Sequence, residues 1–467
     1  MASIIQELHQ KLVNKEISCQ SLVQQKLDAL KSSDLNSANY ILDEYAINLA
    51  QKVDAKIANG ESIGVLEGIP FGVKDVYLLQ GTYSSASSDF LKKYKSPYTA
   101  TAIQKLLDAG AIPVVKENCD SFGHGSSSEN TVFGAVKNAL DANKVAGGSS
   151  GGSAVNVAKD FTTFSIGGDT GGSIRQPAGY NAIYGLKPTY GKISRYGLMA
   201  YASSTDCVGP FAKNLEDLRL VLNAMAGKDY RDQTSFDSEP VTDADITSGL
   251  TKGTKIGYYK NFIESDALDA EMKKAFKDSL AKLEAAGMEI VPLDFFDADT
   301  LVATYYALAM AETASNLARL DGTMYGNREE GKDLKEIYSV TRSENFTEET
   351  KRRIVGGNQV LSQGHSEEIY NKAQAIRQSI SDKFDADFKN VDVVLSPVTP
   401  GPVPEIGNVM KDPKTMYLSD AYTVGFSLGG LPTLTAPVAL ETGIQITAAK
   451  RQESILFTTA NFLKQVL

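Results

Sequence analysis

Residues 147–153 read GGSSGGS and residues 167–177 read GGDTGGSIRQP. Glycine lets the backbone take positive φ angles and lets other atoms approach the chain closely. A serine held in such a loop can be exposed while neighbouring N–H groups point at one spot. That geometry suits a hydroxyl nucleophile with an oxyanion hole, so the two loops predict a catalytic serine.

Two other interpretations of these loops are a flexible linker and a phosphate-binding loop. A linker is usually longer and low in complexity, whereas these loops flank helix-like residues 154–158 and strand-like residues 161–166. A Walker loop needs Gly-Lys-Ser or Gly-Lys-Thr, which the sequence lacks. The glycine spacing of a dinucleotide fingerprint is also missing. An anion-binding or structural role stays open at this point.

The composition is that of an ordinary globular protein. Of its 467 residues, 42% are hydrophobic and 22% charged, and the net charge of −10 argues against nonspecific nucleic-acid binding. The three cysteines, Cys19, Cys119 and Cys207, have no metal-binding spacing and fit a reducing compartment. The first residues do not resemble a signal peptide, and no apolar run reaches the length of about 18 residues that marks a membrane span. We therefore expect a cytoplasmic protein without a membrane segment.

Helix-like and strand-like segments alternate along the chain. This pattern predicts an α/β fold: one large domain over residues 1–467, with a mixed, mostly parallel central β-sheet covered by helices. Its expected parts are N-terminal helices at 1–60, a catalytic core at about 61–230, and lobes or insertions at about 229–253 and 321–349. Apolar spacing predicts helices over 4–13, 20–30, 101–108, 214–226, 267–286, 300–320 and within 348–388, and strands over 111–115, 161–166, 254–259, 288–292 and 391–395.

Candidates for a general base are few. Of the three histidines, only His124, beside the serine-rich residues 125–128, lies near a candidate catalytic loop. This scarcity favours a lysine base. Lys74 lies in the apolar run GIPFGVKDV at 68–76, and burial there would lower its pKa so that the neutral amine could accept a proton. The alternative is a lysine that extends to solvent from the end of a strand.

Asp169 and Arg175 flank Ser173 in the second loop. A buried ion pair between them would hold the loop in shape, whereas a solvated pair would contribute little. The consecutive N–H groups of Thr170, Gly171, Gly172 and Ser173 are the candidates for an oxyanion hole. No metal site is expected from the spacing of possible ligands.

Lys74, the GGSSGGS loop and the GDTGGSIRQP segment together resemble the amidase signature family, and the resemblance extends over nearly the whole chain. It implies the amidase signature fold and a Ser-Ser-Lys triad. In that triad Ser173 is the nucleophile, Ser149 the bridging serine and Lys74 the base. The resemblance also implies a cis peptide at the bridging serine.

Within this family the chain is most similar to the amidase subunits of tRNA-dependent amidotransferases. The similarity lies in GLKPTYG at 185–191, ISRYGL at 193–198, KRRI at 351–354 and MYLSD at 416–420. It implies that Arg353 and Asp420 hold the α-carboxylate and α-amino groups of glutamine. Tyr305 or Tyr306, and Ser126 or Ser127, are further candidates for the pocket.

The same resemblance implies a function and partners. The chain would release ammonia from glutamine for the amidation of misacylated glutamyl- or aspartyl-tRNA. B and C subunits would assemble with it, and the partner would hold most of the tRNA and use ATP and Mg²⁺, so no cofactor is expected in this chain. A free-standing amide hydrolase and a non-catalytic assembly scaffold are the alternatives.

The sequence departs from the family pattern at several positions. Residues 118–127 read NCDSFGHGSS where the family has NMDEFAMGSS, and residues 205–207 read TDC where it has LDQ. The end of the chain after residue 446 is short. These departures leave the triad intact and affect the pocket and the last strand and helix.

Overall fold

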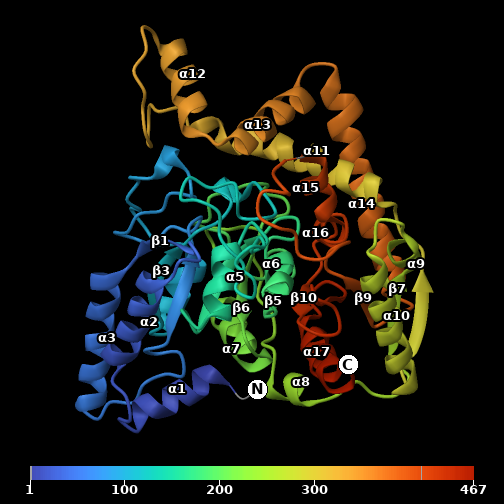
Figure 1. Cartoon of the computed structure of the whole chain (residues 1–467), viewed down its shortest axis with the longest axis horizontal. Coiled ribbons are helices and arrows are strands. Elements are labelled where there is room, and N and C mark those ends of the chain that lie inside the picture. The colour runs from blue at the N-terminus through green and yellow to red at the C-terminus, as the bar shows by residue number, and fades with distance from the viewer. Residues whose placement is uncertain (1–2, 412) are drawn as a thin grey trace.

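The computed structural model describes residues 3–411 and 413–467. In these residues eleven strands form one sheet in the order β1-β3-β2-β4-β6-β5-β10-β11-β9-β7-β8, and Figure 1 shows helices on its faces. The single mixed sheet covered by helices is confirmed. The strands are β1 Ala38–Ile41, β2 Pro70–Lys74, β3 Ile112–Glu117, β4 Phe164–Asp169, β5 Tyr184–Lys187, β6 Cys207–Ala212, β7 Lys255–Tyr259, β8 Glu289–Leu293, β9 Val393–Pro397, β10 Thr433–Ala436 and β11 Ile444–Thr447.

The expectation that the sheet is mostly parallel is wrong. In the described chain β2 pairs in parallel with β3 and β4, and β7 with β8 and β9, whereas the other six neighbouring pairs are antiparallel. The parallel pairs come from β-α-β units, whose helices are easy to predict because their apolar residues recur with the helical period. The antiparallel centre contains β5, β10 and β11, each four residues long, and such short strands leave little pattern in the sequence.

The helices begin and end largely where apolar spacing and capping residues predict. The helix predicted over residues 4–13 is α1, and Ser3 caps it by accepting a hydrogen bond from the Gln6 N–H at 3.0 Å. The helices are α1 Ile4–Val13, α2 Cys19–Ser32, α3 Asp43–Ala58, α4 Thr101–Asp108, α5 Gly151–Ala158, α6 Arg175–Tyr180, α7 Leu215–Met225, α8 Asp243–Thr247, α9 Lys260–Glu264, α10 Ala270–Ala285, α11 Ala298–Asn316, α12 Leu334–Asn345, α13 Glu348–Leu361, α14 Asn371–Asp387, α15 Pro413–Ser419, α16 Val424–Leu428 and α17 Glu453–Val466.

The predicted helical region at 348–388 is interrupted. A π-helical turn at Ser366–Tyr370 joins α13 to α14. None of the helices in the described residues is both long and apolar enough to cross a membrane.

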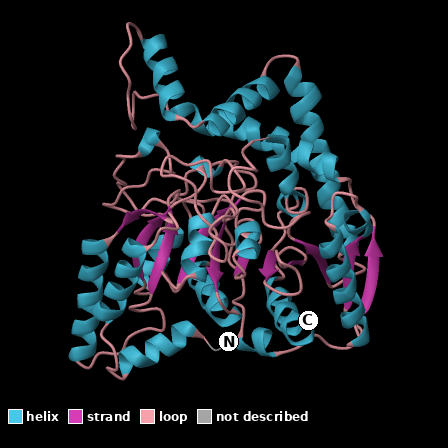
Figure 2. Cartoon of the chain, viewed as in Figure 1, coloured by secondary structure: helices cyan, strands magenta, loops and turns pink. Residues whose placement is uncertain are grey.

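The two strands that carry the candidate site are neighbours. β2 ends at Lys74 and pairs in parallel with β4, which ends at Asp169. The carboxyl ends of parallel strands meet at the same edge of a sheet, the usual position of a binding site in α/β proteins. Figure 2 shows the loops gathered at this edge, between the strands and the outer helices.

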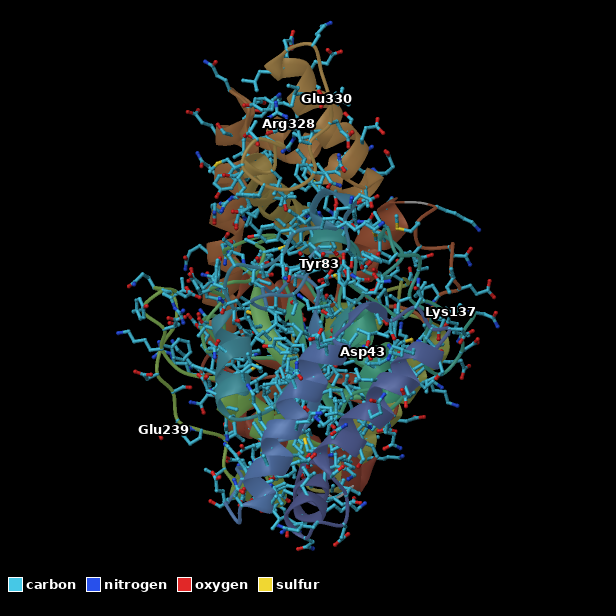
Figure 3. All side chains as sticks on the ribbon, turned by 90° about the vertical axis from the view of Figure 1, so that its left-hand side faces the viewer. Asp43, Tyr83, Lys137, Glu239, Arg328 and Glu330 are labelled. Atoms are coloured by element: carbon cyan, nitrogen blue, oxygen red, sulfur yellow. The ribbon has the colours of Figure 1, made fainter. Side chains whose placement is uncertain are left out.

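A layer of helices covers these loops. α11 and α13 pack against each other on the far side of the loop region, and α12 projects from the body (Figure 1). The part that projects is α12 with the loop before it, and Figure 3 shows Arg328 and Glu330 on this projection, whereas Phe346 and Glu349 are buried in the body. Residues 229–253 form a mainly irregular segment that contains α8.

Gly357 allows α11 and α13 to approach closely. A methyl group at this buried position would overlap the backbone carbonyl of Met310 in α11. We expect Gly357→Ala to destabilise the protein by about 1–3 kcal/mol, because overpacking pushes the two helices apart. The measurement is the denaturant midpoint of unfolding.

The matched control is the neighbouring Gly356→Ala. There the nearest atom is the flexible Met310 Sδ, and alanine favours a helix by up to about 1 kcal/mol over glycine. The same loss of stability in both variants would contradict a contact specific to Gly357.

Candidate active site

Lys74 lies at the end of β2 with only 2% of its surface exposed. Its Nζ lies 2.7 Å from Ser149 Oγ and 2.9 Å from Ser150 Oγ. Burial lowers the pKa of Lys74, while nearby Cys119 and three buried aspartates oppose that shift. The alternative of a lysine extending to solvent is therefore wrong. A buried amine bonded to two hydroxyls is suited to exchange a proton with one of them.

Ser149 and Ser173 belong to adjoining loops. The Ser150 N–H donates to the carbonyl oxygen of Ser173 at 3.2 Å, and the Gly148 N–H donates to Gln176 Oε1 at 3.1 Å. The peptide between Gly148 and Ser149 is cis. Within the described residues Ser149 Oγ is bonded to Lys74, and no hydrogen bond joins it to Ser173 Oγ. Catalytic hydrogen bonds are often long in unliganded enzymes and shorten when substrate binds.

Asp169 and Arg175 form a fully buried pair with two parallel hydrogen bonds, from Nη2 to Oδ1 at 2.9 Å and from Nε to Oδ2 at 3.0 Å. Asp169 also accepts hydrogen bonds from the N–H groups of Gly172 and Ile174, at 2.9 and 3.0 Å. Burial acts to raise the pKa of Asp169, but Arg175 outweighs it and holds that pKa below its usual value. The solvated-pair alternative is wrong, and the pair holds the loop that carries Ser173.

The N–H groups proposed for the oxyanion hole differ in their surroundings. The N–H of Gly172 already points to Asp169, so Thr170, Gly171 and Ser173 are better placed to receive a new acceptor. Side chains from the helical layer press on this loop: a methyl group on Gly171 would collide with the ring of Tyr305, and one on Gly172 with Thr423. These contacts bring Tyr305 to the loop, as the prediction of a pocket residue requires.

Arg353 lies buried in α13 among aromatic rings. Its Nε donates to Glu349 Oε1 at 2.8 Å and its Nη1 donates to the Tyr201 hydroxyl at 2.7 Å. The guanidinium lies 5.2 Å from the ring centre of Tyr306 and 5.8 Å from that of Tyr417. Its Nη2 is buried and has no hydrogen-bond partner in the described residues. An unpartnered buried donor is costly, and an anion could satisfy it.

Asp420 also contacts Tyr306. Tyr306 donates from its hydroxyl to Asp420 Oδ2 at 2.7 Å. Burial raises the pKa of Asp420 to about 7, and the Tyr306 hydrogen bond and the charge of Arg353 limit the rise. The structure therefore brings Arg353 and Asp420 near each other, with Tyr306 in contact with both.

The serine-rich loop lies against the same segment. Ser126 Oγ lies 3.1 Å from Ser419 Oγ, beside Asp420, and 3.4 Å from the carbonyl oxygen of Met416. Ser127 Oγ is buried without a hydrogen-bond partner in the described residues. His124 directs its ring to hydroxyls of Thr313 and Thr350, away from Lys74. The structure thus gives no support to a histidine base.

Several residues of the site escaped sequence reasoning. Tyr201 has no local signal, because a distant segment brings it to Arg353, whereas Tyr417 lies within the MYLSD motif and could have been found there. Glu349 could have been found, since it lies four residues before Arg353 on a predicted helix. Asp206 lines a small cavity of about 20 Å³ beside Lys74 and Ser149 and accepts a hydrogen bond from Thr170 Oγ1 at 2.7 Å.

The amidase family model matches residues 21–457. The chain belongs to the amidase signature family. The A subunit of the glutamyl-tRNA(Gln) amidotransferase of Ruthia magnifica is 42% identical over 462 residues, which are 98% of this chain and 96% of that protein. The protein of the same name from Coxiella burnetii is 44% identical over 437 residues, 93% of this chain and 90% of that one.

Solved structures of amidases have the same fold. The A subunit of the glutamyl-tRNA(Gln) amidotransferase of Thermotoga maritima is 30% identical, with a TM-score of 0.79, over 96% of this chain and 91% of that chain. The peptide amidase of Stenotrophomonas maltophilia is 23% identical and has a TM-score of 0.80, over 99% of this chain and 96% of that chain. At this identity the similarity shows the fold alone. This amidase is therefore an enzyme whose family acts on carboxamides.

The buried Lys74 amine should give amide hydrolysis a characteristic pH dependence. A lysine base works as the neutral amine, so kcat/KM is expected to rise with pH as Lys74 loses its proton, with a midpoint below the ordinary lysine pKa of 10.5. Lys74→Arg, which stays protonated, should lose nearly all activity across the pH range.

Lys74→Ala and Ser173→Ala should each be nearly inactive and their combination little worse, because members of one proton path act as a unit. Steady-state rates, with melting curves for folding, make this test. If the double variant lost activity by the product of the two single losses, Lys74 would lie outside the proton path of Ser173. Lys52→Ala, at an exposed position on α3, serves as the control.

Proposed function

We propose that this amidase is the glutamine-hydrolysing subunit of a tRNA-dependent amidotransferase. The observation that carries the proposal is the pocket of Arg353 and Asp420. Arg353 has a guanidinium nitrogen without a partner in the described residues, and Asp420 is bonded to Tyr306, whose ring also lies beside Arg353. The similar proteins, which are A subunits of glutamyl-tRNA(Gln) amidotransferases by name, support it.

The pocket matches the charges of a free amino acid. The α-carboxylate of glutamine would bind the Arg353 guanidinium, which suits planar carboxylates. The α-ammonium group would bind Asp420. Because Tyr305 touches Gly171 and Tyr306 touches Asp420, consecutive residues of α11 connect this pocket to the catalytic loop. The γ-carboxamide of glutamine would then extend toward Ser173.

The proposed chemistry uses Lys74, Ser149 and Ser173 as a triad, and the Lys74–Ser149 hydrogen bond supports it. Neutral Lys74 accepts the proton of Ser149, Ser149 accepts that of Ser173, and Ser173 Oγ attacks the carboxamide carbon. N–H groups of residues 170, 171 and 173 stabilise the oxyanion. The proton returns through Ser149 to the leaving nitrogen, and ammonia departs. Water then attacks the acyl-enzyme, releases glutamate and restores Ser173.

The ammonia would pass to partner subunits. The relatives are named as subunits, which supports a multi-subunit complex with B and C chains. The partner would hold the misacylated glutamyl- or aspartyl-tRNA and use ATP and Mg²⁺ to activate it. The chain's negative charge and the lack of a Walker motif agree with this division of labour. A cytoplasmic location remains part of the proposal.

The two alternatives predict different behaviour. A free-standing amide hydrolase would be fully active alone and would have no use for a pair of opposite charges in its pocket. A non-catalytic scaffold would have no use for a buried lysine 2.7 Å from Ser149 Oγ. The geometry therefore favours the glutamine-hydrolysing subunit over both.

Ser173→Ala should abolish ammonia release from glutamine and leave the fold intact, because it removes the attacking oxygen. A glutaminase assay beside a melting curve measures this. In the complex assembled with its partners, added ammonia should still support tRNA amidation. Near-normal glutamine turnover in the folded variant would refute Ser173 as the nucleophile.

Arg353→Ala and Asp420→Ala should raise the KM for glutamine strongly, since loss of one member of a buried charge pair costs about 2–5 kcal/mol. A short aliphatic amide lacks the α-charges, so its slow hydrolysis should change much less. Lys351→Ala, a change at a partly exposed position on the same helix, is the control. Equal losses on both substrates would mean that the pair supports the fold or the triad. A wild type that prefers the aliphatic amide would favour the free-standing hydrolase.

The same pocket predicts a pH effect on binding. Asp420 binds the α-ammonium group as a carboxylate, and its pKa is about 7 in the empty pocket because of burial. The KM for glutamine should therefore rise by about tenfold per pH unit below that value, and Asp420→Asn should remove this dependence. A KM that stays flat from about pH 8 to about pH 5 would contradict the role of Asp420.

A further inference from the structure

His124 is fully buried beside the proposed glutamine pocket. Its Nδ1 lies 3.1 Å from Thr350 Oγ1 and its Nε2 lies 3.0 Å from Thr313 Oγ1. The ring stands edge-on to that of Tyr201, with 4.6 Å between ring centres. Both ring nitrogens are thus bonded to hydroxyls, one from α13 and one from α11.

These contacts join the segments that build the pocket. Thr350 lies one turn before Arg353 on α13, and Thr313 lies on α11, which also carries Tyr306. Tyr201 accepts a hydrogen bond from Arg353 on its hydroxyl. The carbonyl oxygen of His124 accepts one from Asn130 Nδ2 at 2.6 Å, which fixes the serine-rich loop.

The neighbouring hydrogen bonds favour one tautomer of the ring. With the Thr313 proton donated to the Tyr201 carbonyl oxygen at 3.1 Å, Thr313 Oγ1 accepts from His124 Nε2–H. Thr347 Oγ1 donates to Thr350 Oγ1 at 3.0 Å, which leaves the Thr350 proton for His124 Nδ1. The chain of donors and acceptors is complete with a neutral ring protonated at Nε2.

We propose that His124 is a positioning residue for the glutamine pocket: its neutral ring joins α11 and α13 to the loop at 125–128 and fixes Tyr201 and, through it, Arg353. This inference rests on the proposed function. Burial, and then the charge of Arg353, lower the pKa of His124 well below its usual value, which agrees with a neutral ring. The family pattern has methionine at this position, so the bonded histidine is a departure of this chain.

The test compares two substitutions of His124 in the full chain. His124→Met keeps an apolar side chain of the family type but leaves two buried hydroxyls without their partner. We expect the KM for glutamine to rise about tenfold, while kcat changes by less than about threefold because the triad is untouched. His124→Gln supplies one acceptor and one donor and should recover most of the affinity. His365→Gln, at an exposed position, should change nothing.

The ring itself can be observed. With three histidines in the chain, a long-range ¹H–¹⁵N spectrum contains three ring systems, and the one absent from His124→Gln belongs to His124. We expect a neutral ring with its proton on Nε2. A ring protonated on Nδ1, or a cationic ring, would overturn the proposal even if a variant failed to fold.

Other outcomes separate this proposal from the function on which it rests. A wild type that does not hydrolyse glutamine refutes the proposed function. An unchanged KM in a folded His124→Met variant, with an active wild type, refutes only the role of His124. A fall in kcat for both glutamine and an aliphatic amide, without a change in KM, would also refute the proposal. It would mean that His124 supports the catalytic loop and not the glutamine pocket.

Discussion

The buried pair of Asp169 and Arg175 is the interaction on which the rest of the site depends. Asp169 accepts hydrogen bonds from N–H groups of the loop that carries Ser173. Arg175 is bonded to Asp169 and also to a second segment of the chain. The guanidinium donates to the carbonyl oxygen of Thr423 and to Ser427 Oγ, both at 2.8 Å. Those residues follow Asp420 in the chain. One ion pair thus connects the catalytic loop to the segment that carries Asp420, the carboxylate proposed to bind the substrate.

Such a pair is a costly way to stabilise a protein. Burying two charges loses their hydration, and apolar residues of similar volume are often at least as stable. What the pair provides is a fixed geometry: five hydrogen-bond donors of a planar guanidinium are directed at set acceptors. The loop is rich in glycine and has little side-chain packing of its own, so its shape has to come from Asp169 and Arg175.

The neighbouring residues Lys74 and Asp75 show how the same fold treats two buried charges differently. Asp75 has its own cation, Lys116, whose Nζ lies 3.3 Å away, and it also accepts hydrogen bonds from Asn39 and Ser85. Lys74 is instead hydrogen-bonded to the hydroxyls of Ser149 and Ser150 and, at a longer distance, to the carbonyl oxygen of Gly168, and none of these partners is a carboxylate. Because Lys116 takes the adjacent carboxylate, Lys74 keeps a lowered pKa and can serve as a base.

Sequence reasoning succeeded where a feature is local. The bounds of α1 and α4, the lysine in an apolar run and the glycine loops all depend on residues close together in the chain. It failed where the structure depends on distant pairings. The antiparallel pairing of β10 with β5 and the approach of Tyr201 to Arg353 join segments that lie far apart in the sequence, where no local pattern predicts the contact. The resemblance to a family identified Arg353 and Asp420, which local sequence alone leaves as ordinary polar residues.

The separation of chemistry from recognition follows from this arrangement. The edge of the sheet at β2 and β4 supplies the base and the serines, which need a rigid frame because proton transfer depends on short, fixed distances. In the proposed function, Arg353 of α13 and Asp420, which follows α15, supply the charges that distinguish one amide from another. The two meet where Tyr305 and Thr423 press on Gly171 and Gly172. Glycine at both positions lets the recognition layer lie directly on the catalytic loop, so binding of the α-charges can align the scissile amide with Ser173.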